Sequence, residues 1–338
     1  MLDATTTHVL KDVLHSAHLT AIGPVRTPDE GRIAINAIVP TQEEGTVLVR
    51  VRPKNINDQT MKILGYKPER FVYEPIAINH YKDQGIPVPE LLPLKNETTF
   101  LFDTPECYAY VYRLTEGKTV EQADLSLSLV TQIAELLSRF INASEKFTDD
   151  GKMPDGDIDY IVQILRSYLD IDSSKESLEV IDSMVSYLGD ESQRDKFEAT
   201  PSGLVHGDLF YENIILSDRG EISIIDFGDI YYGKVLMDIT TSAMEFSCVH
   251  DALDEDLFVA MIAPTASWFA IHNVGFETFH YALLANCARF AAHTLHLEHV
   301  PGQTQNPSEN DYVQRFHQFQ KGEKNSLERL FSLACQKD

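Results

Sequence analysis

The hydrophobic and polar positions in the first third of the chain predict a small sheet accompanied by two helices. Apolar residues recur with helical spacing over residues 5–17, which predicts an amphipathic helix. Short alternating runs separated by turn sequences such as TPDEG and PTQEEG then predict an antiparallel meander. A further helix is expected over residues 68–83, ending before Gly85. The expected strands are Leu19–Val25, Arg32–Val39, Thr46–Arg52, Thr98–Phe102 and Cys107–Arg113.

From about residue 123 onward, the pattern changes to long runs with helical spacing. The run LSLSLVTQIAELLSRFINA repeats its apolar residues three and four positions apart, as the buried face of a helix does. A strand-rich hairpin interrupts the helices over residues 204–231, and helical texture returns after residue 237. A β-rich N-terminal part followed by a helical C-terminal part predicts an α+β protein with two lobes. We place the N-terminal lobe, an antiparallel sheet plus a helix, at residues 1–113 and the larger, mostly helical lobe at residues 114–338.

The charge balance excludes some classes of partner. The chain has 338 residues, with 52 Asp and Glu against 28 Lys and Arg, and its formal net charge is −24. A nucleic-acid binder needs the opposite sign, and anionic membrane surfaces repel such a protein. The field favours a cationic ligand, although an acidic surface also serves solubility alone. We therefore expect no nucleic-acid partner.

Membrane and export signals are also missing from the sequence. No apolar run reaches the roughly 18 residues that a membrane-spanning helix needs. The N-terminal stretch has an early Asp and neither a basic cluster nor an apolar segment typical of a secretory signal. The four cysteines are far apart and form no CxxC pair, which favours a reducing environment. We expect a cytoplasmic protein without membrane association.

The segment LVHGDLFYENIILSDRGEISIIDFGD carries the candidate chemistry. It contains a His-Gly-Asp triplet ending at Asp208, then Asn213, and after two short apolar strands an Asp-Phe-Gly triplet beginning at Asp226. If the two strands form a hairpin, Asn213 and Asp226 come to one edge of it. Mg²⁺ prefers oxygen ligands from one or two carboxylates, amides, phosphates and waters. We therefore expect Asn213 and Asp226 to be magnesium ligands.

The remaining carboxylate of the segment has the chemistry of a catalytic base. Phosphoryl transfer depends mainly on positioning and on stabilising spread-out negative charge. Asp208 can accept the proton of an attacking hydroxyl and hold that hydroxyl in line. His206 follows an apolar strand end, and we interpret it as a scaffold residue rather than a catalyst.

These two triplets resemble those of a known enzyme group. The pattern H-G-D-L-F-x-x-N followed by I-D-F-G-D is similar to that of the aminoglycoside phosphotransferase and choline kinase family, relatives of the protein kinases. The resemblance implies a protein-kinase-like fold and a kinase that uses ATP and Mg²⁺, with GTP as the alternative nucleotide. The glycine-rich loop over the nucleotide is poor, because only Gly31 lies between the first two strands, and the choice between ATP and GTP stays open.

The resemblance extends upstream to the nucleotide side. In the run VLVRV, Arg50 stands where protein kinases have a Lys that binds phosphate. An Arg at this position resembles the branch of the family that includes bacterial homoserine kinases of this fold and hydroxylysine kinases. Glu74 stands where the family has the helix Glu that pairs with this basic residue, although Pro75 is awkward in the middle of a helix. The nucleotide is expected near Arg50 and a hinge at Tyr110 and Tyr112.

The acceptor is expected to be a small cationic molecule with a hydroxyl group. Residues 116–200, where the family inserts acceptor-binding helices, contain nineteen Asp and Glu against eight Lys and Arg. An aminoglycoside is one choice, and an amino alcohol or hydroxy amino acid such as homoserine, choline or hydroxylysine is the other. A kinase-like binding protein without activity is a third interpretation, which loss of Asp208, Asn213 or Asp226 would mark; all three are present.

Overall fold

The computed structural model divides the chain into two compact units, which are described separately. It describes residues 4–27, 34–55, 70–94, 99–149, 151, 153, 156–250, 252–299 and 306–336. The N-terminal unit consists of Met1–Asp58, Tyr66–Thr119 and Ile214–Ile230, and the helical unit of Gln59–Gly65, Val120–Asn213 and Tyr231–Asp338. The expected domain boundary between residues 113 and 114 stays a prediction. The division into compact units assigns the segment 214–230 to the N-terminal unit.

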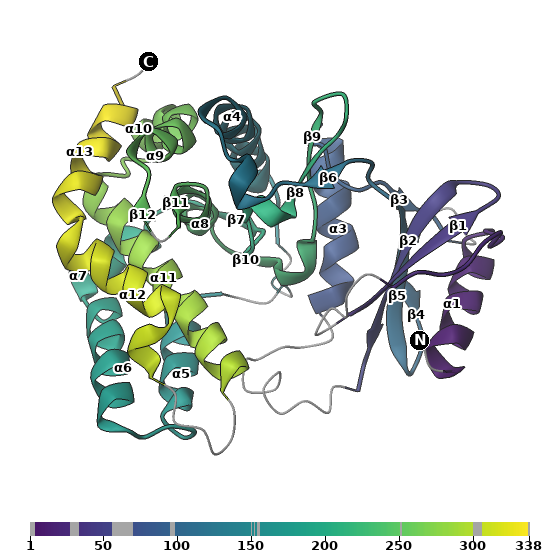
Figure 1. Cartoon of the computed structure of the whole chain (residues 1–338), viewed down its shortest axis with the longest axis horizontal. Helices are drawn as coiled ribbons and strands as arrows, with labels where there is room; N and C mark the ends of the chain where they lie inside the picture. The colour runs from purple at the N-terminus through teal and green to yellow at the C-terminus, as the bar shows by residue number, and fades with distance from the viewer. Residues whose placement is uncertain are drawn as a thin grey trace. The chain divides into compact units, whose positions relative to one another are not determined.

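An antiparallel sheet forms the centre of the N-terminal unit (Figure 1). Its strand order is β1-β2-β5-β3, and β4 also pairs with β5. In the register, Arg50 lies opposite Tyr110, and Leu48 lies opposite Tyr112. Because side chains alternate between the faces of a strand, these four share one face of the sheet. The strands are β1 (Ile35–Thr41), β2 (Gly45–Pro53), β3 (Leu91–Leu92), β4 (Phe102–Asp103) and β5 (Cys107–Arg113).

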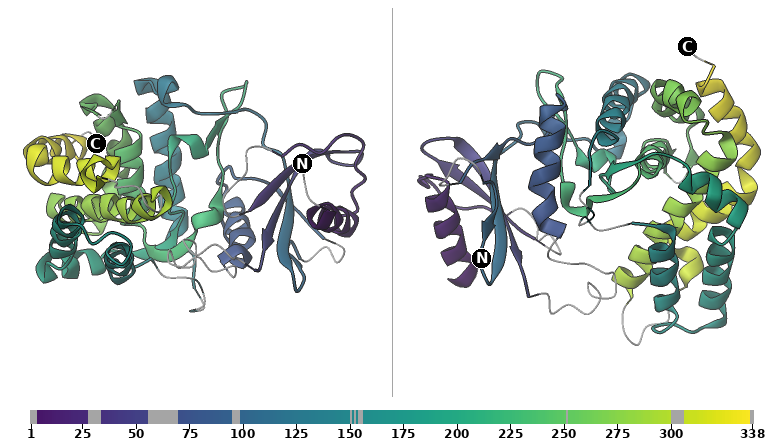
Figure 2. Two further views of the ribbon diagram at one scale, coloured as in Figure 1. Left: turned by 60° about the horizontal axis from the view of Figure 1, so that its bottom comes forward. Right: turned by 180° about the vertical axis from the view of Figure 1, so that it is seen from behind.

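Two helices cover the two faces of this sheet (Figures 1 and 2). Helix α1 (Ala4–Ser16) packs Leu10, Val13 and Leu14 into a core with the apolar face of the sheet. Helix α3 (Arg70–Asp83) lies on the other face, where Phe71 stacks on Tyr110 with ring centroids 4.6 Å apart. The expected sheet with its helix is thus confirmed, and residues 68 and 69 lie outside the described part.

The expected first strand, Leu19–Val25, is wrong. Within this segment only Ala21 forms an isolated bridge, to Thr41, and a second isolated bridge joins the next residue, Arg26, to Ile38. Pro24 lies in the segment and cannot donate an amide to a ladder, which gives a physical reason for the interruption. In the same region, β1 begins at Ile35, and residues 28–33, including Gly31, lie outside the described part. The strand expected at Thr98–Phe102 is reduced to β4, and Thr98 is also outside the described residues.

The motif-bearing hairpin is present in the N-terminal unit. Strand β8 (Ile214–Leu216) pairs with β9 (Ile222–Ile224) and with β6 (Lys118–Thr119), all antiparallel. Ile214 lies opposite Ile224, so the hairpin begins one residue after Asn213 and ends two residues before Asp226. The short helix η3 (Phe227–Asp229) follows, and Phe227 is fully buried with its ring 5.6 Å from that of Tyr81 in α3.

Packed helices make up most of the other unit, as expected from the change of pattern near residue 123. Helix α11 is its buried centre and packs against α5, α7, α8 and α12. Strands β7 (Ser202–Val205) and β10 (Tyr231–Lys234) form a two-stranded antiparallel ribbon. Among the described residues, no helix combines the length and apolar character that crossing a membrane requires. The main helices are α4 (Leu127–Ser144), α5 (Ile158–Tyr168), α6 (Lys175–Leu188), α7 (Glu191–Glu198), α8 (Leu236–Glu245), α9 (Glu255–Ile262), α10 (Ala266–Ile271), α11 (Phe276–Glu298), α12 (Asp311–His317) and α13 (Lys324–Ala334).

Candidate active site

The His-Gly-Asp triplet forms the turn that follows β7 in the helical unit. The strand ends in the fully buried residues Leu204 and Val205, so the triplet starts from a fixed point in the core. Gly207 has a φ of +79°, a left-handed conformation in which a side chain would be strained. The glycine therefore lets the chain turn sharply and present Asp208, which is half-buried, at the surface of the unit.

A buried carboxylate in α8 holds the amide groups of this turn. Asp238 Oδ2 accepts a hydrogen bond of 2.7 Å from the His206 amide, and Oδ1 accepts one of 3.0 Å from the Gly207 amide. Burial raises the pKa of Asp238 to about 7, against the lowering effect of these two amides and of Arg289. These contacts make Asp238 a brace of the turn that precedes Asp208.

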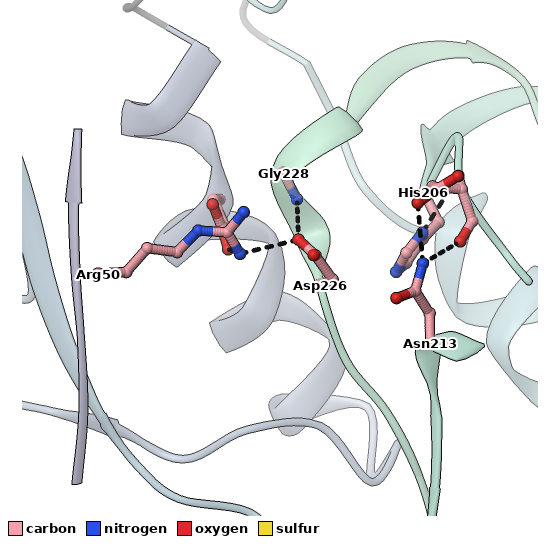
Figure 3. Close-up of polar contacts among 7 residues, drawn as sticks. Arg50, His206, Asn213, Asp226 and Gly228 are labelled. Atoms are coloured by element: carbon pink, nitrogen blue, oxygen red, sulfur yellow. Dashed lines mark hydrogen bonds and ion pairs between the residues drawn. The ribbon is translucent and has the colours of Figure 1, made fainter. Parts of the chain in front are cut away.

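Asn213 forms two hydrogen bonds with Asp208. Its Nδ2 donates a hydrogen bond of 2.7 Å to the Asp208 carbonyl and one of 2.9 Å to Asp208 Oδ2 (Figure 3). The five-residue separation permits this because the short helix η2 (Tyr211–Asn213) folds the chain back on the loop. With the nitrogen directed to Asp208, the amide offers its oxygen to a metal ion, and an amide oxygen adds no negative charge beside a polyanion.

In the N-terminal unit, Arg50 links two carboxylates. Arg50 Nη1 lies 3.1 Å from Glu74 Oε1 and 2.8 Å from Asp226 Oδ1. Figure 3 shows the Arg50 side chain extending from β2 toward Asp226, whose Oδ1 also accepts a hydrogen bond of 3.3 Å from the Gly228 amide. The pair of Arg50 and Glu74 exists although Pro75 is the next residue of α3. Asp226 itself has a left-handed backbone, with φ 60° and ψ 72°.

Burial and charge act against each other in this cluster. Glu74 is 2% exposed and Arg50 11%, whereas the Asp226 side chain is 44% exposed. Burial raises the pKa of Glu74 to about 7, although Arg50 acts to lower it. Burial opposes the charge of Arg50, but the carboxylates of Asp226 and Glu74 hold its pKa well above the usual value. The guanidinium is therefore charged, and the exposed carboxylate of Asp226 is the member of the cluster that solutes can reach.

Tyr110 and Tyr112 lie on the same sheet face as Arg50. Tyr110 is fully buried, and its ring stacks on Phe71 of α3; Tyr112 is 8% exposed. Burial raises the pKa of both phenols, so they are neutral near pH 7. Their expected contact with a nucleotide stays a prediction.

The structure joins the expected residues into two groups. Asp208 and Asn213 are bonded in the helical unit, and Arg50, Glu74 and Asp226 are bonded in the N-terminal unit. Because the two groups belong to different units, the expected convergence of Asn213 and Asp226 stays a prediction. The ion pair of Arg50 with Asp226 was not expected from the sequence.

Sequence reasoning also missed two polar residues in α11, Asn286 and Arg289, which are both buried. They stand in the run LLANCARFAAH, and a charged residue inside an apolar helix is the signal that could have drawn attention to them. Arg289 Nη2 donates a hydrogen bond to the Gly207 carbonyl, so the residue touches the candidate catalytic loop.

Comparison with known proteins identifies the family. The sequence model of the phosphotransferase enzyme family matches residues 62–266, which is more than half of the chain. The chain belongs to this family. It is therefore a kinase-type phosphotransferase for small molecules, and the resemblance deduced from the two triplets is confirmed. No curated protein sequence matches the chain.

Solved structures of several small-molecule kinases and phosphotransferases have a similar fold. An amicoumacin kinase, solved with AMP-PNP, Ca²⁺ and Ami, is 14% identical with a TM-score of 0.67, covering 96% of this chain and 94% of that one. A choline kinase from Cryptosporidium parvum Iowa II is 13% identical with a TM-score of 0.63, covering 97% and 99%. An aminoglycoside phosphotransferase from Alicyclobacillus acidocaldarius is 15% identical with a TM-score of 0.61, covering 96% of each chain. The expected two-part, kinase-like α+β fold is confirmed.

Proposed function

We propose that the enzyme transfers the γ-phosphate of ATP, or alternatively of GTP, to a hydroxyl group of a small cationic acceptor. The observation that carries this proposal is the double hydrogen bond from Asn213 to the backbone and the carboxylate of Asp208. These two bonds hold a carboxylate that can act as base beside an amide whose oxygen can bind Mg²⁺. Phosphoryl transfer requires both groups.

Asp208 is the proposed catalytic base. The acceptor oxygen forms a bond to the γ-phosphorus while the bond from that phosphorus to the β-phosphate oxygen breaks. The hydroxyl proton passes to the Asp208 carboxylate, which is half-buried and is oriented by Asn213. Asp208 thus also selects a hydroxyl that approaches in line with the breaking bond.

Asn213 and Asp226 are the proposed magnesium ligands. The donor chemistry fits, because a carboxylate and an amide oxygen are the hard ligands that Mg²⁺ prefers, alongside phosphate oxygens and waters. Asp226 is exposed enough to exchange its contact with Arg50 for a metal ion. Bound Mg²⁺ would neutralise the charge of the phosphate groups.

Arg50, Glu74, Tyr110 and Tyr112 are the proposed nucleotide-side residues. Arg50 has the forked geometry that binds phosphate oxygens, and Glu74 holds it from α3. Tyr110, which is buried under Phe71, would act through the packing that fixes the Arg50 strand, and Tyr112 extends the same face.

A cationic acceptor is supported by charge. The chain carries a net charge of −24, and residues 116–200, which hold an excess of carboxylates, lie in the helical unit from Val120 onward. An aminoglycoside-like acceptor is our first candidate, in keeping with the fold shared with the Alicyclobacillus enzyme. An amino alcohol or hydroxy amino acid (choline, homoserine or hydroxylysine) is the second, and the similar fold of a choline kinase supports it.

The test is nucleotide turnover against a panel of acceptors. ADP and GDP release is coupled to a detection enzyme in the presence of aminoglycosides, macrolides, choline, homoserine or hydroxylysine, with Asp208→Ala as the matched control. Turnover with one acceptor that the variant abolishes supports the proposal and names the substrate. Folded protein that binds the magnesium nucleotide but transfers phosphate to none of these compounds would be a kinase whose acceptor lies outside the panel. Folded protein that binds no nucleotide would overturn the proposal.

A further inference from the structure

The peptide bond that precedes Asp208 is held at both of its polar atoms. The Gly207 carbonyl and the Asp208 amide belong to one planar group, so fixing both fixes the orientation of the plane. Arg289 Nη2 donates to the Gly207 carbonyl, and the Asp208 amide donates a hydrogen bond of 3.3 Å to His206 Nδ1. The direction in which Asp208 leaves the backbone therefore depends on Arg289 and His206.

Arg289 is itself fixed in the core of the helical unit. It is 8% exposed, and its guanidinium lies 4.2 Å from the centre of the Phe290 ring. Its Nε donates a hydrogen bond of 3.4 Å to Asn286 Oδ1. Asn286 Nδ2 in turn donates bonds of 2.7 Å to the Met237 carbonyl and 2.8 Å to Thr240 Oγ1, both in α8. The guanidinium is thereby anchored to two helices.

The same helix α8 holds the other side of the loop. Asp238 accepts the amides of His206 and Gly207, while Arg289 donates to the Gly207 carbonyl. A carboxylate and a guanidinium thus hold successive peptide groups, and Arg289 is also the cation that acts on the buried charge of Asp238. The two side chains form a clamp around the turn, which we call the loop clamp.

A buried arginine is a costly way to fill space. An apolar side chain would pack in α11 without the desolvation penalty of a charge, so Arg289 is explained by its contacts rather than by packing. Lysine could not replace it, because one ammonium group cannot reach Asn286 through Nε and Gly207 through Nη2 at once. The geometry of a guanidinium is what this position uses.

We infer that Arg289 is a positioning residue for phosphoryl transfer. It fixes the plane of the Gly207–Asp208 peptide and so the orientation of the Asp208 carboxylate. The inference rests on the proposed function for its effect on the reaction. Its effect on the loop does not depend on any activity.

The test compares Arg289→Met and Arg289→Lys with the wild-type enzyme. Methionine keeps the length and removes the charge, and lysine keeps the charge and removes the fork. Arg194→Met is the control, since Arg194 pairs with Asp159 on helix α5 at 2.7 Å and, among the described residues, forms no hydrogen bond with Asp238 or Arg289 of the loop clamp. Hydrogen–deuterium exchange reports on the amides of residues 206–208, and steady-state kinetics give kcat and KM for each substrate.

Both measurements have definite expected results. In Arg289→Met, we expect exchange at residues 206–208 to accelerate about tenfold or more while helices α4 to α6 keep their protection. We expect kcat to fall by about 10- to 100-fold with both KM values changed by less than about threefold, since misorientation affects the transition state more than binding. The loop exchange rate and kcat of Arg289→Lys should lie between those of Arg289→Met and the wild type. Both quantities in Arg194→Met should match the wild type.

Several outcomes overturn the inference. Unchanged loop exchange together with kcat within about twofold of the wild type removes any positioning role. A raised acceptor KM with unchanged kcat makes Arg289 a binding residue instead. If Arg289→Met does not fold, Arg289→Lys decides, because wild-type loop exchange and kcat in the lysine variant contradict the need for the fork. If the folded wild type binds no nucleotide, the proposed function fails, and the exchange measurement still decides whether Arg289 orders the loop.

Discussion

Arg50 Nη1 lies 2.8 Å from Asp226 Oδ1, although the two residues are 176 positions apart in the sequence. The same nitrogen lies 3.1 Å from Glu74 Oε1, so one guanidinium serves a buried and an exposed carboxylate. Strand β2, helix α3 and the segment after β9 are tied together through this cation. The residue proposed to grip phosphate is therefore also a structural member of its unit.

Removal of Arg50 should destabilise the N-terminal unit through Glu74. Arg50→Met leaves a carboxylate that is 2% exposed without its cation, and we expect a loss of about 3–5 kcal/mol in the free energy of unfolding. Glu74→Gln in the same chain should recover part of this loss. Urea denaturation of the two single variants and the double variant measures the coupling. If the two losses simply add, the ion pair does not contribute as described.

The charge of Glu74 should make stability depend on pH. Burial raises the pKa of Glu74 from 4.5 to about 7, so the folded protein binds this proton more tightly than the unfolded chain does. The resulting contribution is fully present below pH 4.5 and is lost as the pH rises toward 7, amounting to roughly 3 kcal/mol at most. Glu74→Gln should remove this contribution. Denaturation of both proteins at several pH values between 4.5 and 7 should show the difference between them changing with pH; a constant difference contradicts the raised pKa.

Asn213 should determine the magnesium requirement. Asn213→Ala removes both the amide oxygen and the two hydrogen bonds to Asp208. We expect the Mg²⁺ concentration for half-maximal turnover to rise about tenfold or more and kcat to fall. Titration of turnover with Mg²⁺ at saturating nucleotide measures both, with Asn142→Ala as a control on the exposed face of α4. An unchanged Mg²⁺ dependence would exclude Asn213 as a ligand.

Gly207 should tolerate no side chain. Its φ of +79° strains any other residue, and the loop clamp holds its peptide groups from both sides. Gly207→Ala should lose about 1–3 kcal/mol of folding stability and should lower kcat. Gly220, also left-handed with φ +80° but at a turn with open space around it, provides the matched control. Thermal melts and turnover are compared between Gly220→Ala, which introduces backbone strain at a distant turn, and Gly207→Ala, which introduces it in the loop before Asp208. Equal losses of kcat in the two variants would contradict a special role for Gly207.

The sequence could predict what lies close together along the chain. The hairpin strands and the positions of the two triplets before and after them depend on neighbours within about 25 residues. The pair of Arg50 and Glu74 was reached through the family resemblance. In contrast, the contacts of Arg50 with Asp226 and of Arg289 with Gly207 span 176 and 82 positions, and no local pattern encodes such distances.

The failed first strand shows a different limit. Apolar residues over Leu19–Val25 have strand character, but propensity does not register whether each backbone donor finds a partner. Pro24 lacks that donor, and the segment touches β1 only at isolated bridges. Backbone pairing in the folded unit overrode the local preference.

The role of Asp208 as catalytic base is tested most directly by measuring transfer of radiolabelled γ-phosphate by Asp208→Asn. Asparagine keeps the shape of the side chain and an oxygen for the Asn213 amide, and it cannot accept the hydroxyl proton. We expect this variant to bind the magnesium nucleotide within about threefold of the wild type while phosphate transfer to the acceptor falls by about 10²- to 10⁴-fold. Transfer at the wild-type rate by the folded variant would contradict the assignment of Asp208 as the catalytic base.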